Sequence, residues 1–147
     1  MRRTLVAMAA GLIVSVLTVT VLAGCGGGDS VHSAGGARTI EIDMRDNDFS
    51  SASLSVKAGE QVQFVFHNKG AVTHDAYIGD DAAQMTHEQE MRASSDPSHG
   101  HGTDGVTVEP GKTETLTHTF AKSGPTLIGC HVLNHYMLGM RIRVNVT

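Results

Sequence analysis

The sequence predicts an all-β sandwich with one short helical insert, and three observations support this prediction. Short segments of alternating apolar and polar residues recur after residue 38, separated by turn residues, as in sandwiches built from about seven short strands. Gly accounts for 17 of the 147 residues and aromatic residues for only 4%, which suits a globular body with many turns and does not fit a coiled coil. Only residues 80–93 are rich in helix formers.

The first half of the body contains four expected strands. Residues 39–44 (TIEIDM) alternate apolar and polar side chains, and residues 54–56 indicate a short second strand. After the turn at residues 57–60, residues 62–66 alternate again, and another strand follows near residues 73–78. These lengths are typical of sandwich strands.

The second half supplies the remaining strands. Residues 106–109 are followed by Pro110 and Gly111, a pair suited to the central positions of a type II turn. Residues 113–120 then alternate, and the chain closes with two further expected strands at residues 126–129 and 142–146.

One segment interrupts the strand pattern. Residues 80–93 (DDAAQMTHEQEMRA) predict a short helix, because helix formers dominate and acidic Asp80 and Asp81 are favourable at a helix N-terminus. Residues 94–104 are polar and contain Gly and His, which predicts a mobile surface loop.

The N-terminus has the form of an export signal. Arg2 and Arg3 precede an apolar run, residues 5–23, which leads into Leu-Ala-Gly-Cys. This ending resembles the bacterial lipoprotein signal and implies that residues 1–24 are removed and Cys25 is lipidated, attaching the protein to the membrane. The alternative is an uncleaved transmembrane helix. Both readings place the body outside the cytoplasm, in the cell envelope or periplasm.

The expected mature chain has a tether and one domain. Residues 25–38 are Gly-rich without apolar periodicity, which is typical of a flexible tether, and residues 39–147 form the expected domain. Residues 25–147 contain nine Lys and Arg against fifteen Asp and Glu. Because no basic cluster is available to neutralise phosphates, nucleic acid is not an expected partner.

The densest chemical motif contains an unpaired cysteine. Lipidation of Cys25 would leave Cys130 without a disulfide partner. In an oxidising compartment, such a thiol is an inert buried residue, a nucleophile or a metal ligand. Residues 129–140 (GCHVLNHYMLGM) place Cys130, His135 and Met140 in a Cys-x4-His-x4-Met pattern between two expected strands. Thiolate, imidazole and thioether are soft ligands that favour copper over hard cations.

A further ligand comes from a distant part of the chain. His74 follows the strand expected at residues 62–66 and a Gly-containing turn. Two His and one Cys with a weak axial Met make a blue-copper, or type 1, electron-transfer site. We therefore predict one type 1 copper per chain, bound by His74, Cys130, His135 and Met140.

With their order and strand context, these four residues make the chain resemble the cupredoxins, the family of plastocyanin and azurin. The resemblance covers residues 39–147 and implies a Greek-key β-sandwich, these four residues as copper ligands, and the edge of His135 as the electron's exit. Asp75 departs from the Asn that many relatives have after the first His, and the ligand loop lacks a Pro found in many members. The spacing also resembles the type 1 centre of multicopper oxidases, but Gly129 replaces the His before their Cys.

Other interpretations of the motif remain open. Cys130 is an inert core thiol in one of them, and in another it is a nucleophile with His131 or His135 as its base. Zinc would accept Cys and His, but Met is a poor zinc ligand, so Met140 favours copper. Met137 competes as the axial ligand, although the resemblance and the following strand favour Met140.

The helical insert and its loop suggest a second site. Their His and Met residues form either a labile second metal site or part of a lid for partner docking, and the alternative is a solvated surface segment. The candidate ligands are Met85, His87, Met91, His99 and His101.

The leading functional hypothesis is a one-electron carrier that cycles between Cu(I) and Cu(II), held near membrane-bound redox partner proteins by its lipid, and not an enzyme. The alternative is an envelope protein that buffers or delivers copper through the insert. A metal-free adhesion or sensor module with the same fold is the third hypothesis.

Overall fold

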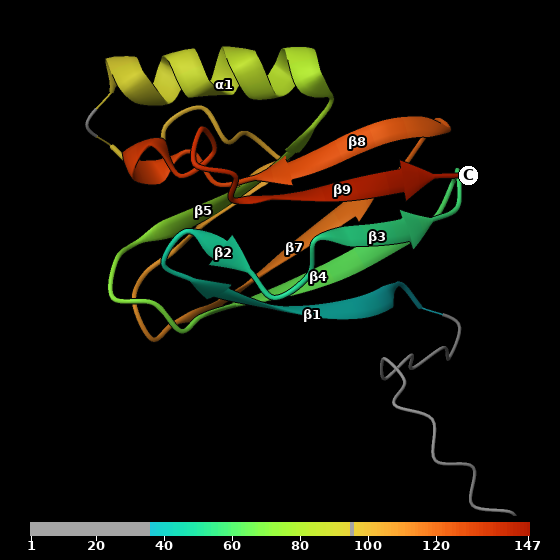
Figure 1. Cartoon of the computed structure of the whole chain (residues 1–147). Helices are drawn as coiled ribbons and strands as arrows, with labels where there is room; N and C mark the ends of the chain where they lie inside the picture. Colours follow the sequence, from blue (N-terminus) through green and yellow to red (C-terminus); the bar gives the residue numbers. More distant parts are fainter. Residues whose placement is uncertain (1–35, 95) are drawn as a thin grey trace, which may run out of the picture.

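The computed structural model describes residues 36–94 and 96–147 (Figure 1). The expected signal peptide, the lipidation site Cys25 and most of the expected tether lie outside the described residues. The first strand begins at Arg38, which the sequence analysis assigned to the tether. Within the described residues, no helix has the length and apolar character needed to cross a membrane.

Two β-sheets form the body. The four-stranded sheet has the order β2-β1-β4-β7, in which β1 and β4 are parallel and the other pairs antiparallel. Its strands are β1 (Arg38–Arg45), β2 (Asp48–Phe49), β4 (Gln61–Asn68) and β7 (Thr113–Thr119). The five-stranded sheet has the order β3-β9-β8-β5-β6, in which only β3 and β9 are parallel. Its strands are β3 (Ser53–Val56), β5 (His74–Gly79), β6 (Gly105–Val108), β8 (Gly124–Gly129) and β9 (Arg141–Val146). The predicted Greek-key sandwich is confirmed.

The two sheets bury alternate residues between them, as the periodicity predicted. In β4 the side chains of Val62, Phe64 and Phe66 are fully buried. The ring of Phe64 lies 5.9 Å from that of Phe66 and 6.2 Å from that of Phe120. Each fully buried side chain of this kind contributes about 1.5–3 kcal/mol. This core fixes the sheet ends that carry the site.

Helix α1 (Asp81–Ala93) confirms the predicted insert, and Figure 1 shows it outside the sandwich, beside β8. Asp80 caps its N-terminus, accepting a hydrogen bond of 2.9 Å from the backbone N–H of Ala83. One face of α1 is buried, whereas the alternative interpretation, a solvated surface segment, required this face to be exposed. That face contains Gln84, His87, Glu88 and Met91.

Candidate metal centre

The expected copper ligands lie at one end of the five-stranded sheet. His74 begins β5, Cys130 directly follows β8, and Met140 directly precedes β9. Strand β8 is hydrogen-bonded to β5 on one side and to β9 on the other. The sheet therefore brings His74 next to a loop that lies more than fifty residues away in sequence.

Three ligand side chains converge inside this end of the sandwich. The Nδ1 atoms of His74 and His135 each lie 3.5 Å from Sγ of Cys130. His74 and Cys130 are fully buried, and His135 is 5% exposed. With bonds of about 2.3 Å to sulfur and about 2.0 Å to nitrogen, a metal ion at tetrahedral or trigonal angles needs roughly 3.5–3.8 Å between them. The three side chains fit a single metal ion.

Backbone hydrogen bonds close the ligand loop. The N–H of Cys130 donates to the carbonyl of Met140 at 3.1 Å, and the N–H of Met140 donates to the carbonyl of His135 at 3.0 Å. Between them lies a short 3-10 turn (Val132–Asn134) in which Leu133 and Asn134 have positive φ angles of 51° and 63°. Such a conformation costs free energy in a residue other than Gly and persists only where the surroundings fix it.

The two methionines of the loop differ in burial. Met140 is 1% exposed and stands at the closed base of the loop, whereas Met137 is 58% exposed. This difference favours Met140 as the axial ligand. Thiolate, two imidazoles and a buried thioether form a soft donor set, and this set fits copper better than zinc.

Comparisons with known proteins identify the family of the chain. The sequence matches the cupredoxin-like domain over residues 12–125. The chain belongs to the cupredoxin-like family. The matched range ends before Cys130, so the ligand assignment in the loop rests on the geometry described above.

Sequence relatives and solved structures with the same fold span most of the chain. The copper-resistant cuproprotein CopI of Pseudomonas aeruginosa is 33% identical over 141 residues, covering 77% of this chain and 78% of the relative. CopI of Rubrivivax gelatinosus is 34% identical over 104 residues, covering 70% of this chain and 62% of the relative. Auracyanin from Roseiflexus castenholzii superposes with a TM-score of 0.64 at 23% identity, covering 76% of this chain and 99% of its own. Auracyanin A, a "blue" copper protein from Chloroflexus aurantiacus, has a TM-score of 0.62 at 25% identity, covering 76% of this chain and all of its own.

Burial controls the protonation of the ligands in this cupredoxin-like protein. Burial raises the pKa of the Cys130 thiol well above its ordinary value, and the Asp75 carboxylate adds to the effect. Burial lowers the pKa of His74, and neighbouring His135 lowers it further. Burial also lowers the pKa of His135. At neutral pH, metal binding therefore has to displace the thiol proton but finds both imidazoles neutral.

Asp75 connects the first ligand strand to the ligand loop. Its fully buried carboxylate accepts backbone N–H bonds through Oδ1, at 2.6 Å from His131 and 3.3 Å from Val132. Burial raises the pKa of Asp75, but hydrogen bonds from His101 and His87 outweigh burial and hold the pKa well below its ordinary value. A charged carboxylate thus fixes the backbone directly after Cys130.

The helical insert holds the same loop from the other side. His131 is 3% exposed, and its Nδ1 lies 2.7 Å from Oε2 of Glu88 while its Nε2 lies 2.7 Å from Oε1 of Gln84. Its ring also stacks on Tyr136 with 4.5 Å between centroids. The sequence analysis considered His131 as a possible base for Cys130. The structure instead makes it the joint between α1 and the ligand loop.

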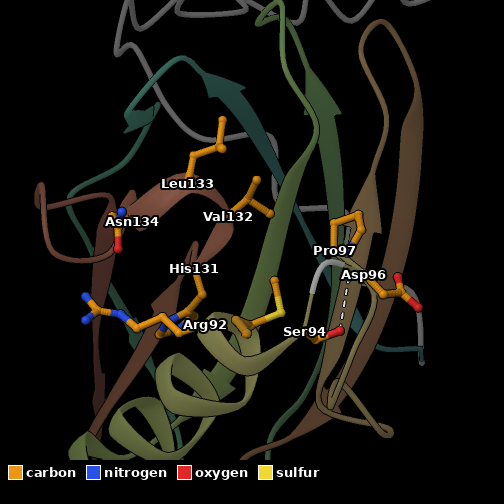
Figure 2. Close-up of a pocket in the computed structure, with 9 residues that line it drawn as sticks. Arg92, Ser94, Asp96, Pro97, His131, Val132, Leu133 and Asn134 are labelled. Carbon is orange, nitrogen blue, oxygen red and sulfur yellow. Dashed lines mark hydrogen bonds between the residues drawn. The ribbon is translucent and has the colours of Figure 1, made fainter.

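A surface pocket lies where the end of α1 faces this loop. Figure 2 shows Arg92 and Ser94 from the helix end on one side and Val132, Leu133 and Asn134 from the loop on the other. Met91 also lines the pocket. The insert and the ligand loop therefore line one pocket together, and the lid for partner docking stays a prediction.

The five candidate ligands of the insert do not form one cluster. His87 and His101 come together, and each places Nε2 3.3 Å from Oδ2 of Asp75. His99 is exposed, Met85 is 48% exposed, and Met91 faces the pocket. The sequence analysis missed Asp75 as a member of this group, although its departure from the usual Asn was the available signal.

Proposed function

We propose that this protein binds one type 1 copper ion and carries single electrons outside the cytoplasm. The observation that supports the proposal most strongly is the convergence of His74, His135 and Cys130 with both Nδ1 atoms 3.5 Å from one thiol. Copper bound there would supply a one-electron couple. The chain's own contribution is a fixed ligand geometry in a water-excluded site, which limits rearrangement when the charge changes.

The ligand loop also presents an apolar surface for a redox partner. Leu133, Met137 and Leu138 are 66%, 58% and 69% exposed, and all three stand within four residues of His135. Exposed apolar residues grouped in this way are typical of interaction sites. We propose that a partner protein docks here and that electrons leave through His135. Lipidation at Cys25 would keep the protein beside partners in the membrane of the cell envelope.

Repeated redox cycling tests this proposal. The full-length copper-loaded protein would be reduced with dithionite and reoxidised with ferricyanide in the presence of a copper chelator. We expect a one-electron Nernst curve and unchanged copper content after several cycles, because the ligands are buried in both states. Loss of copper on reduction would contradict the carrier function. Leu138→Asp should leave the Nernst curve unchanged, because Leu138 is not a copper ligand. The same variant should slow electron transfer to the redox partner protein, because Leu138 belongs to the proposed docking surface.

Copper buffering or delivery is the second candidate function. It is supported by the relatives named copper-resistant cuproproteins, which are 33% and 34% identical to this chain over the aligned residues. The two functions differ in metal exchange at the Cys130 centre. A carrier retains isotopically labelled copper over hours, whereas a protein that delivers copper releases it to an acceptor of moderate affinity. Neither candidate is a catalyst.

A further inference from the structure

A second group of metal-binding side chains is buried between α1 and the loop that follows it. Asp75, His87 and His101 form this group, which we call the Asp75 cluster. Their ligand atoms all lie within 4.8 Å of one another, and all three residues are buried. Oδ2 of Asp75 is 3.3 Å from Nε2 of His87 and 3.3 Å from Nε2 of His101. None of these residues belongs to the ligand set around Cys130.

A contact with Thr107 orients the ring of His101 toward Asp75. The hydroxyl of Thr107 donates to the carbonyl of Pro97 at 3.1 Å, so its oxygen is left to accept from Nδ1 of His101 at 3.3 Å. This contact orients the ring so that Nε2 of His101 faces the Asp75 carboxylate, 3.3 Å from Oδ2. A proton or a cation between these two atoms stabilises their approach.

Ring stacking orients His87. Its ring is 1% exposed and stacks on Tyr77 at 4.1 Å, which fixes the orientation of Nε2 toward Asp75. Nδ1 has no hydrogen-bond partner among the described residues, and the nearest carboxylate oxygen, from Glu90, is 3.7 Å away. A carboxylate hydrogen bond commonly orients a metal-bound imidazole through its second nitrogen, and for His87 the stack on Tyr77 provides the orientation instead.

The distances match a coordination shell better than a set of direct hydrogen bonds. Charge-assisted hydrogen bonds between nitrogen and carboxylate oxygen are about 2.7–2.9 Å long, shorter than both contacts of Asp75 with His87 and His101. Two ligands bound to one ion at about 2.0–2.1 Å and a near-tetrahedral angle lie roughly 3.3–3.4 Å apart. Both imidazole contacts of Asp75 equal this separation.

We propose that the Asp75 cluster is a second metal site that binds one divalent transition-metal ion, with Cu(II) bound most tightly. Two imidazoles and a carboxylate without sulfur suit a borderline cation and disfavour Cu(I). Among divalent ions, Cu(II) binds such nitrogen and oxygen donors more strongly than Zn(II). This second metal site is separate from the proposed electron transfer. The proposal of a second site does not depend on whether the Cys130 centre carries electrons.

The surroundings allow the ion to enter. His101 is 8% exposed and belongs to a loop whose neighbouring residues are mostly exposed. Gly100 has a φ of +77°, and a Cβ there would lie 2.5 Å from Oε2 of Glu90 and 3.3 Å from Nδ1 of His87. The loop therefore lies directly on α1, with the backbone of Gly100 against His87 and Glu90. Displacing this loop opens the cluster, so its ion exchanges faster than copper at Cys130.

Copper stoichiometry tests the proposal. Full-length protein would be dialysed against excess Cu(II) and examined by metal analysis, visible absorption and paramagnetic resonance. We expect two coppers per chain, the second with a tetragonal signal and no thiolate band. His87→Ala and His101→Ala should each bind one copper and keep the thiolate band, which also reports that the variant is folded. The matched control His99→Ala, on the same loop, should bind two.

One copper per wild-type chain would overturn the proposal, and so would two coppers in both cluster variants. If an alanine variant loses the thiolate band, His101→Gln provides a milder change. With Cu(I) at the Cys130 centre, Zn2+ alone should then raise the thermal midpoint of wild type by several degrees and leave that of His101→Gln unchanged. The same Zn2+-induced shift of the thermal midpoint in wild type and His101→Gln would refute the site. The absence of a shift in wild type would refute it as well.

Discussion

Replacing Asp75 tests the hydrogen bonds that connect β5 to the ligand loop. Asp75→Ala removes the acceptor of two backbone N–H bonds, a buried one from His131 at 2.6 Å and a partly buried one from Val132 at 3.3 Å. A short hydrogen bond to a charged group is worth about 1.5–3 kcal/mol and a long one about 0.5–1 kcal/mol. We expect a loss of about 2–4 kcal/mol, a large part of the stability of a domain this size.

Asp75→Asn is the matched variant. Its side-chain oxygen still accepts both N–H bonds but carries no charge, and neutral bonds are roughly half as strong, so we expect a loss of about 1–2 kcal/mol. At about 4 °C per kcal/mol, the thermal midpoint should fall by about 8–16 °C in the alanine variant and about 4–8 °C in the asparagine variant. Calorimetry of the metal-free full-length proteins measures both.

The pH dependence of this effect has a definite sign. The pKa of Asp75 is lowered in the folded protein, so its stabilisation is complete above the unfolded pKa of about 3.9 and is lost as pH falls toward the folded pKa. The difference between wild type and Asp75→Ala should stay constant from pH 5 to 8 and shrink below about pH 4. Equal losses in both variants, or a difference that grows at low pH, would refute the reasoning.

Copper affinity at the Cys130 centre should rise about tenfold per pH unit from pH 7 to 9, because burial raises the pKa of the thiol whose proton copper displaces. Competition with a chelator measures this slope, and an affinity that does not change with pH would contradict the prediction. Gly129→Ala should lower the free energy of unfolding by about 1–3 kcal/mol, because the added Cβ would lie 2.5 Å from Oε1 of Gln84 and 2.7 Å from the Tyr136 ring. A denaturant midpoint equal to that of wild type would argue against this packing. Zn2+ at the Asp75 cluster should raise the reduction potential of the Cys130 centre, because nearby positive charge disfavours the more oxidised state of the copper. Voltammetry measures this potential, and a lower potential in the presence of Zn2+ would contradict the prediction.

The fold was readable from sequence where periodicity extended over several residues. Strand β4 buries Val62, Phe64 and Phe66 in strict alternation, and the capped helix α1 ends at Ala93 as expected. Strand β2 was missed because two residues cannot show a period. Only Phe49 in it is buried, and it follows a turn in which Asn47 has a φ of 65°.

The Cys130 centre was readable because three of its residues are close in sequence, and His74 was found from its place after an expected strand and a turn. Cys130, His135 and Met140 share one short loop, so their spacing carries the signal. The Asp75 cluster has no local pattern, because the pairing of β5 with β6 brings Asp75 opposite Thr107 and thereby close to His101. Sequence periodicity places residues on faces of one element and does not specify which strands become neighbours.

The most direct test of the central claim is the visible and paramagnetic resonance spectrum of the full-length protein loaded with one equivalent of Cu(II), beside the spectrum of Cys130→Ser. An intense thiolate-to-copper band in wild type that disappears in the variant is the expected result. A pale, tetragonal copper signal that is the same in both proteins would contradict a type 1 centre at His74, Cys130 and His135.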